Sequence, residues 1–377
     1  MSKMKKIALL IETSTTYGRE LIRGIIQYAN ISCPWIFYKD PSGLSEKLPS
    51  IDKWGLDGII MRDTPQNLKL LELHIPTIVS IRYQEKIAGI PNIIGNSDLI
   101  GKMAAEYFYN KGFTVFAFCG MNNFPWSKER EETFRNAVCS KGTIYIYDQQ
   151  IKVLDYEKEL AAIAQWLSTL PKPVAVMACN DVRGAHIIEA CKLAQIQVPD
   201  EVAVLGVNND DMICELTSPP LSSIALDIHK AGQQAAMCLE RMMSGKKITE
   251  QNIMVEPKHV MTRRSTDILA INNPEIAAAI KYIQHNSKKY IQVNDVTAAV
   301  GTNRRSLERS FKQHLKRSIH EEITRMRIDT ISRMLTETNL SIAEIAMSMG
   351  FSDINHISRY FKASKKISPF KFRKNHA

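Results

Sequence analysis

Short, continuous apolar runs alternate with longer amphipathic stretches through the front part of the chain, up to residue 206. The runs are rich in β-branched residues and lie at 6–11, 58–60, 77–81, 114–119, 174–178 and 202–206. The amphipathic stretches have the spacing of helices and lie at 17–29, 65–73, 98–110, 126–139 and 181–191. Strands that are apolar without alternation are buried on both faces, as in a parallel sheet covered by helices. The pattern therefore predicts an α/β, doubly wound fold.

In such a fold, functional side chains collect in the loops that follow the strands, at the carboxyl edge of the sheet. Here those loops carry amides, carboxylates, arginines and a tryptophan: Glu12, Thr13, Ser14 and Thr16; Arg82; Asn96 and Asp98; Trp126 and Arg130; Asn180 and Asp181; Asn208, Asn209, Asp210 and Asp211. Planar donors and acceptors bind hydroxyl groups in pairs, and an aromatic ring covers the apolar face of a pyranose. We therefore predict a neutral, polyhydroxylated ligand held by Ser14, Arg82, Asn96, Trp126, Arg130, Asn180, Asp181 and Asn208.

Several of these positions also have a purely structural interpretation. Asp98, Asp181 and Asp227 stand where the N-caps of helices belong, and a cap needs no ligand. Arg130 lies in a charged stretch and can be a solvated helix side chain, while Trp126 can belong to the core. The sequence leaves both interpretations open.

A different pattern occurs twice near the end of the chain, at residues 307–312 and 357–362, as apolar-x-Arg-x-Phe-Lys. An apolar helical stretch precedes each copy and ends in Gly301 or Gly350. Glycine permits the positive φ that closes one helix before the next begins. This arrangement predicts two helix-turn-helix units, joined by a connecting helix over 321–335; one such pattern alone is often an ordinary helical hairpin.

The second helix of each unit has one apolar face and one polar face. Asn303 and either Ser352 or Asp353 are placed to cap these helices. The outward side chains are of the types that bind base edges and phosphates. We predict that duplex DNA is bound by Arg304, Arg305, Glu308, Arg309, Lys312, Asn355, His356, Arg359 and Lys362.

Charge supports this division. The chain has 377 residues and a net charge of +10, and all of that excess lies in residues 274–377, which hold 19 Lys and Arg against 9 Asp and Glu. A basic solubilising face is the alternative to a polyanion-binding unit. The seven cysteines lie before residue 274 without a CxxC pair, so we expect a reduced, cytoplasmic protein with no metal site. Neither a signal peptide nor a membrane helix is predicted.

Enzymatic motifs with a Gly-rich phosphate loop, a zinc-binding helix or a nucleophile elbow are missing from the sequence, and no cofactor is predicted. An enzyme that processes a sugar or nucleoside through Asp181 or Asp210 stays an alternative, as does a binding protein for transport. The transport alternative requires export and leaves the basic segment without a role.

The string from Gly350 to Arg373, with Gly-Phe-Ser, Ser-Arg-Tyr-Phe-Lys and Ser-Pro in order, resembles the AraC-type DNA-binding domain. The front part resembles the sugar-binding core of LacI-type repressors, through Trp54-Gly55-Leu56-Asp57-Gly58, Val198-Pro199-Asp200-Glu201-Val202, Pro219-Pro220-Leu221-Ser222-Ser223-Ile224 and Arg263-Arg264-Ser265-Thr266-Asp267. The two parts in this order are similar to the family of xylose-operon regulators, over nearly the whole chain.

The resemblance implies a two-lobed, periplasmic-binding-protein-like sugar-sensing domain at 1–265, a linker at 266–280 and an all-α DNA-binding domain at 281–377. It also implies a homodimer at promoter repeats, working with RNA polymerase to activate pentose utilisation genes; a repressor that responds to a different sugar is the alternative. Positions matching Arg130, Asn180, Asn208 and Asn96 hold sugar hydroxyls in the family. Asn96 and Asn208 replace a common Asp, and Lys316 and Lys366 replace a common Gly.

Overall fold

The computed structural model describes residues 4–32, 34–39, 55–121, 123–147, 156–246, 248, 252–268, 273–315 and 317–376. Lys316 and Cys33 therefore lie outside the described residues, as does Trp54. The chain forms two compact units, one of Met1–Phe108 with Thr114–Ile268 and one of Tyr109–Phe113 with Leu269–Ala377. Helix α9 begins at Pro274, inside the segment that we expected to be a linker. The domain limits inferred from the sequence stay a prediction.

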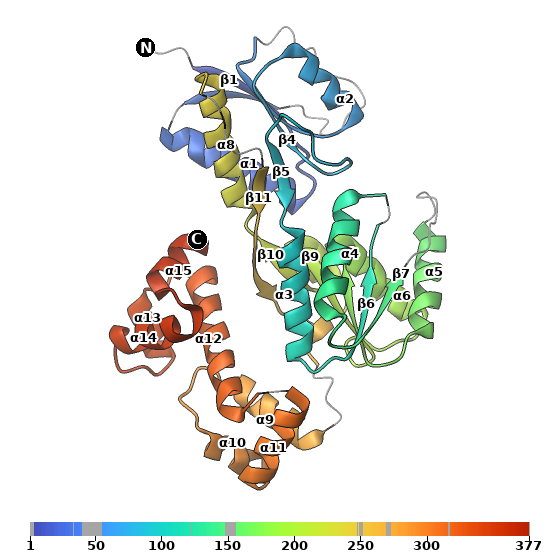
Figure 1. Ribbon diagram of the computed structural model, residues 1–377, viewed down its shortest axis with the longest axis vertical. Coiled ribbons are helices and arrows are strands. Elements are labelled where there is room, and N and C mark those ends of the chain that lie inside the picture. Colours follow the sequence, from blue (N-terminus) through green and yellow to red (C-terminus); the bar gives the residue numbers. More distant parts are fainter. Residues whose placement is uncertain are drawn as a thin grey trace. The chain divides into compact units, whose positions relative to one another are not determined.

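The first unit contains two sheets, each of six strands among the described residues (Figure 1). The first sheet is entirely parallel and has the order β11-β5-β4-β3-β1-β2. Its strands are β1 (Lys5–Leu10), β2 (Trp35–Lys39), β3 (Gly58–Arg62), β4 (Thr77–Ser80), β5 (Asn92–Gly95) and β11 (Asn252–Val255). Its helices are α1 (Thr16–Ser32), α2 (Pro65–Leu68) and α8 (Ile228–Met243), followed after α2 by the 3₁₀ turn η2 (Lys69–Leu73).

Helices α1 and α8 pack with their backbones in close approach. A Cβ atom at Gly24 would lie 1.9 Å from the carbonyl oxygen of His229, and one at Gly232 would lie 2.2 Å from that of Leu21. Because these distances are far inside van der Waals contact, neither glycine tolerates a side chain without separation of the helices. The pair covers one side of the first sheet as a unit.

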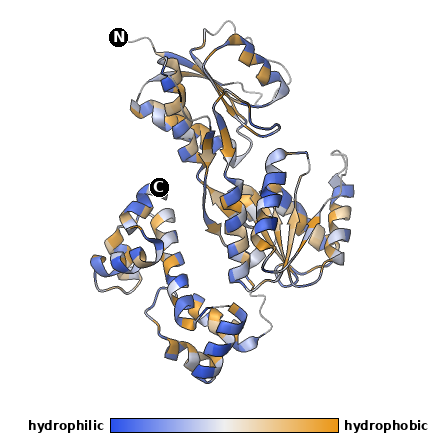
Figure 2. Cartoon of the chain, in the orientation of Figure 1, coloured by the Kyte–Doolittle hydropathy of each residue, from blue (hydrophilic) through white to orange (hydrophobic). Residues whose placement is uncertain are grey.

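The second sheet has the order β12-β10-β9-β8-β6-β7 and is parallel except for β12, which runs antiparallel to β10. Its strands are β6 (Val115–Cys119), β7 (Thr143–Tyr147), β8 (Val174–Ala178), β9 (Val202–Asn208), β10 (Ser222–Leu226) and β12 (Pro257–Met261). Its helices are α3 (Ser97–Asn110), α4 (Pro125–Val138), α5 (Tyr156–Thr169), α6 (Asp181–Leu193) and α7 (Asp211–Leu216). Figure 2 shows the apolar strands of this sheet between helices that have a polar face.

The chain passes between the two sheets three times, after β5, β10 and β11. The crossings are hydrogen-bonded to one another: the backbone N–H of Asn96 donates to Val255 at 3.0 Å, and that of Asp227 donates to Glu256 at 2.7 Å. The amide of Asn96 also donates to the Glu256 carboxylate at 2.8 Å. Two α/β lobes joined by three adjacent strands confirm the two-lobed, doubly wound fold expected from the sequence.

The predicted apolar runs did not include β2, β5, β7, β11 or β12, nor β10, which begins with two serines. Ser222 and Ser223 are nevertheless fully buried. The backbone N–H of Ser222 donates to Ser265 Oγ at 2.8 Å, and its hydroxyl bonds to Thr266 at 2.6 Å, both in the 3₁₀ turn η3 (Arg264–Thr266). Satisfied hydroxyl groups therefore substitute for the apolar side chains of an interior strand.

The second unit is helical in its described residues and has two apolar cores. It comprises α9 (Pro274–His285), α10 (Val293–Val300), α11 (Arg304–Leu315), α12 (Ile319–Glu337), α13 (Ile342–Ser348), α14 (Ile354–Lys365) and α15 (Pro369–His376). Helix α12 places Ile323 in the first core and Ile328, Ile331 and Leu335 in the second. It is therefore the connecting helix that the sequence predicts.

Each helix pair turns at a glycine in the left-handed region, with φ of 74° at Gly301 and 70° at Gly350. In the second pair, the side chain of Asp353 accepts a hydrogen bond from the backbone of His356 at 2.7 Å and caps α14. Of the two candidate caps, Ser352 instead hydrogen-bonds the side chain of Asp353. Lys366 has a φ of 63° after α14, so a lysine occupies the left-handed position expected for glycine.

Candidate functional site

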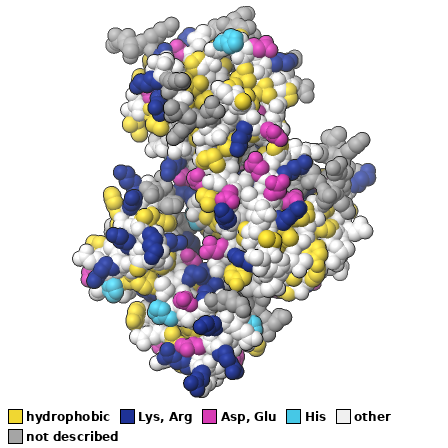
Figure 3. Space-filling model, viewed as in Figure 1, with side chains coloured by type: hydrophobic (Ala, Val, Ile, Leu, Met, Phe, Trp, Pro, Cys, Tyr) yellow, Lys and Arg dark blue, Asp and Glu magenta, His cyan; other side chains and the backbone are white. Residues whose placement is uncertain are grey.

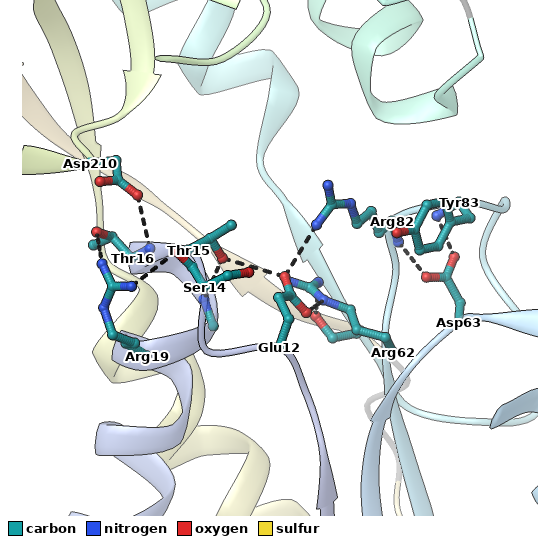
Figure 4. Close-up of polar contacts among 12 residues, drawn as sticks. Glu12, Ser14, Thr15, Thr16, Arg19, Arg62, Asp63, Arg82, Tyr83 and Asp210 are labelled. Carbon is teal, nitrogen blue, oxygen red and sulfur yellow. Dashed lines mark hydrogen bonds and ion pairs between the residues drawn. The ribbon is translucent and has the colours of Figure 1, made fainter. Parts of the chain in front are cut away.

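A buried ion-pair network lies at the carboxyl edge of the first sheet (Figure 4). Arg62 ends β3, and its Nε and Nη2 each donate to a carboxylate oxygen of Glu12 at 2.8 Å. Arg82, which follows β4, approaches the same carboxylate at 3.3 Å. Burial opposes ionisation of Glu12, but the guanidinium of Arg62 outweighs it and lowers the pKa of that carboxyl. The network holds Arg82 next to the carboxylate of Glu12, whose charged form the two arginines favour.

The sequence pattern named Glu12 and Arg82 but missed Arg62, which is only 3% exposed. Its guanidinium also lies over the ring of Tyr17, 4.6 Å from the ring centre. A signal was present, because a charged residue that ends a fully apolar strand needs a buried partner. Beside it, Asp63 accepts hydrogen bonds from the backbone N–H groups of Arg82, Tyr83 and Gln84 at 2.7–2.8 Å and holds this loop in place (Figure 4).

Arg130 is buried in α4 and is 6% exposed, so the interpretation of this residue as a solvated helix charge is wrong. Its Nη1 donates to the carbonyl oxygen of Cys179, and its guanidinium lies over the ring of Trp126 at 4.9 Å. Its Nε has no hydrogen-bond partner among the described residues, and none of their carboxylates forms an ion pair with it. Burial lowers its pKa. The unfilled Nε donor of this buried guanidinium can bind a ligand oxygen such as a sugar hydroxyl.

Two hydrogen bonds join the lobes, one of them made by Trp126 beside Arg130. The indole Nε1 of Trp126, in the second lobe, donates to the backbone oxygen of Arg82 in the first at 3.0 Å. The backbone N–H of Thr16, which begins α1, donates to the carboxylate of Asp210 at 2.9 Å (Figure 4). Trp126 is half-buried rather than part of an apolar core. Arg82, Trp126 and Arg130 are therefore brought together by direct contacts.

The helix caps lie just before the positions that the sequence indicated. Asn96 accepts from the backbone of Leu99 at 3.1 Å, and Asn180 accepts from that of Arg183 at 2.8 Å. Asp98 and Asp181 are therefore not the caps: exposed Asp98 pairs with Lys102 at 2.7 Å. Asp227 precedes α8 but makes no side-chain cap bond. The carbonyl oxygens of the two asparagines serve the helices, which leaves their amide N–H groups for other partners.

Asp181 is 1% exposed and has both carboxylate oxygens in use. They accept hydrogen bonds from Ser223 Oγ and from the backbone N–H of Asp210 at 2.7 Å. Burial raises the pKa of Asp181 to about 7. Asp181 therefore positions the loop that presents Asp210.

The two remaining predicted ligand residues stand apart from these contacts. Ser14 is exposed in the loop after β1, where its backbone oxygen accepts from Arg19 at 3.1 Å. Asn208 ends β9 with a φ of 112°, a conformation that few residues other than glycine adopt. Strain of this kind is typical of functional positions, but the structure brings neither residue into contact with Arg130.

The predicted DNA-binding residues lie on α11 and α14, the second helices of the two glycine-turned pairs. Leu307, Phe311, Ile357 and Phe361 are buried beneath them. Glu308 is half-buried, and the other predicted residues are exposed: Arg304, Arg305, Arg309, Lys312, Asn355, His356, Arg359 and Lys362. Figure 3 shows many Lys and Arg side chains on the helical unit. The outward and inward assignments made from the sequence agree with this burial.

The described helices contain no apolar span long enough to cross a membrane. The described part of the chain likewise contains no cluster of acidic, cysteine or histidine side chains arranged to hold a metal ion. Apart from exposed Ser14, the predicted ligand residues are thus buried or half-buried, whereas the predicted DNA-binding residues are basic or polar and mostly exposed.

Comparison with known proteins identifies the domains of the chain. Residues 105–266 match a periplasmic binding protein-like domain, and residues 296–375 match a helix-turn-helix domain. The xylose operon regulatory protein of Haemophilus influenzae is 31% identical over 98% of this chain and 98% of its own. The chain belongs to the family of xylose operon regulatory proteins.

The xylose operon regulatory protein of Escherichia coli K12 is 28% identical over 99% of this chain and 97% of its own. The solved structure of the xylose-binding transcription activator xylR has a TM-score of 0.63, with 28% identity, and covers 100% of this chain and 99% of that one. This chain is therefore a sugar-responsive transcription regulator that binds DNA. The enzymatic alternative is not supported, because these relatives are regulators.

Proposed function

We propose that the chain binds a pentose, xylose or a close stereoisomer, between the two lobes of its first unit. In this proposal it acts in the cytoplasm as a homodimer on promoter repeats, where it activates transcription by RNA polymerase. The names of its full-length relatives refer to the xylose operon and support this choice of sugar.

One observation carries the sugar site: the buried guanidinium of Arg130 has an unfilled Nε donor and no ion-pair partner among the described residues. An unpaired buried cation costs free energy in the empty protein. Sugar hydroxyls that accept from this fork recover part of that cost without introducing a second charge. The adjacent ring of Trp126 covers the apolar face of the sugar.

The remaining ligand contacts come from both lobes. Arg82 and Ser14 belong to the first lobe, and Asn180 and Asn208 to the second, with Asn96 at a crossing between them. Asp181, whose two carboxylate oxygens already accept hydrogen bonds, acts by positioning the loop of Asp210. Because a ligand held by both lobes favours the arrangement in which they are close, its binding energy shifts the equilibrium between two states of the unit. We infer that this shift changes the affinity of the helical unit for DNA.

A thermal-shift screen of the full chain against xylose, arabinose, ribose and glucose tests the proposal. A ligand at a hundred times its Kd stabilises the native state by about 2.7 kcal/mol, so the correct pentose raises the Tm of the sugar-binding transition. Arg130→Met keeps the apolar stem and loses the fork, and we expect it to abolish the shift. Arg135→Met, at a half-exposed position on the same helix, is the matched control and keeps it. A native chain that responds to none of the sugars contradicts the proposal.

A further inference from the structure

A cavity of about 300 Å³ lies within the helical unit, where the two helix-turn-helix pairs meet. Its lining comes from both pairs, the segment before them and the helix between them, and it includes Tyr290, Arg304, His320, Arg327, His356 and Tyr360. Among the described residues that line it, two are arginines and two are histidines, and none is an aspartate or glutamate. The cavity is therefore suited to an anion rather than to a cation.

Arg327 lies at this cavity with a buried charge that no carboxylate balances. It is 3% exposed, and its two Nη atoms donate to the backbone oxygens of Lys289 and Met349. Its guanidinium lies over the ring of Phe351 at 5.1 Å, and burial lowers its pKa. No ion pair in the described part of the chain includes it.

A buried carboxylate on the same helix, α12, does have ion-pair partners. Glu322 is fully buried on α12, five residues before Arg327, and it forms ion pairs with both Arg317 and Arg325. The structure thus compensates a buried negative charge twice and leaves a nearby buried positive charge uncompensated. A buried cation of this kind gains from an anion that arrives on binding.

The position of the cavity identifies the anion. Arg304 is the first residue of α11, and His356 lies in the first turn of α14, so the starts of both recognition helices border the cavity. When two such helices enter successive turns of the major groove, the DNA backbone between those turns faces the protein between the helices. That backbone carries one negative charge per phosphate.

We propose that the cavity receives the phosphates of the DNA strand that passes between the two major-groove contacts. The proposal rests on DNA binding through both recognition helices. Arg327 supplies positive charge from the interior. Arg304 and Tyr290 contact the phosphate oxygens from the rim, where Tyr290 is 72% exposed. Glu308 and Asn294 hold Nε and Nη1 of Arg304, which leaves its Nη2 to donate.

The test uses a duplex selected from a random pool by the full chain, with its two major-groove contacts mapped by base methylation. Methylphosphonate linkages, which are neutral, replace the phosphates between the two contacts in one duplex and an equal number outside them in a control duplex. We expect the central replacement to weaken native binding roughly three- to tenfold and the outer replacement to have a smaller effect.

Arg327→Gln removes the charge, and we expect this variant to bind the unmodified duplex more weakly than the native chain. Replacing the central phosphates should then lower the affinity of the variant by a further factor of less than about two. Because Arg327 also joins two backbone segments, Tyr290→Phe provides a second variant at an exposed position, and its central penalty should also shrink. Equal central penalties in the native chain and both variants overturn the proposal. The proposal is also overturned if central replacement leaves the DNA affinity of the native chain unchanged, whether or not inorganic phosphate competes with DNA. A native chain that selects no duplex contradicts DNA binding itself, which is a separate failure.

Discussion

The indole N–H of Trp126 donates to the backbone oxygen of Arg82 at 3.0 Å, and the two residues belong to different lobes of the first unit. The same ring contacts the guanidinium of Arg130, so one side chain both joins the lobes and borders the proposed ligand. We expect this contact to change when the lobes move, which would link ligand binding to the arrangement of the lobes.

Trp126→Phe keeps an aromatic ring and removes this hydrogen bond. Since one such bond contributes about 0.5–1.5 kcal/mol, we expect sugar affinity to fall by roughly two- to tenfold, as measured by calorimetry. Trp166→Phe, in the apolar core of the second lobe, should leave the affinity unchanged. An unaltered affinity in the Trp126 variant would show that the bond is the same in both states.

Asp181 should make stability depend on pH. Its pKa is raised from 3.8 to about 7 by burial, so the folded chain holds a proton that the unfolded chain has lost between those values. Stability from this group is present at low pH and declines as pH rises through that range, by at most about 1.4 kcal/mol per pH unit.

In Asp181→Asn, the amide oxygen can accept from Asp210 while the amide nitrogen donates to Ser223, so the neutral pattern is kept. Urea unfolding at pH 5 and pH 7.5 should show a smaller loss of stability for this variant than for the native chain. Asp98→Asn, at an exposed site, should retain the native loss. A native midpoint that rises over this interval, with no difference in the Asn variant, would contradict the assignment.

The two recognition helices should contribute separately to DNA binding. Arg309→Ala and Arg359→Ala each remove an exposed guanidinium, and a base-contacting arginine is worth about 1–3 kcal/mol. We expect at least a fivefold loss of DNA affinity in a gel-shift titration, with the sugar-induced thermal shift intact. Arg333→Ala, at an exposed position on α12, is the control. Loss of the sugar response together with DNA binding would indicate misfolding.

Lys366 should contribute in opposite senses to stability and to DNA binding. Its φ of 63° costs about 1 kcal/mol for a residue with a Cβ, so Lys366→Gly should raise the Tm of the helical unit by several degrees. If the lysine contacts a phosphate, the same change lowers the salt dependence of DNA binding by about one ion. Lys365→Gly, at the last residue of helix α14, should instead lower the Tm.

The pattern of residues close in sequence was sufficient to predict the structure of the helical unit. The repeat, the two glycine turns and the buried Phe311 and Phe361 depend on residues close in sequence, and the structure shows each of them. The parallel core was also readable as a class, because its interior strands are apolar without alternation. Strand β10 was not, since its serines are satisfied by residues more than forty positions later.

The candidate ligand residues show the same limit. Arg130 follows a strand closely enough for sequence to identify it, but its burial against Cys179 and Trp126 depends on two distant segments. Arg62 was missed because its partner Glu12 lies fifty residues earlier. Asn96 and Asn180 were identified as ligands, whereas their carbonyl groups act as helix caps, which is decided by where each helix begins.

Helix α12 contributes side chains to both cores of the DNA-binding unit. An α-helix turns by about 100° per residue. A single insertion in the middle of α12 would therefore rotate one helix-turn-helix pair relative to the other and move it along the helix axis by about 1.5 Å. Substitutions on α11 and α14 alter which bases are preferred, but they do not change the rotation and separation of the two pairs. The operator of any descendant of this protein can therefore diverge in sequence far more readily than in the spacing of its two halves.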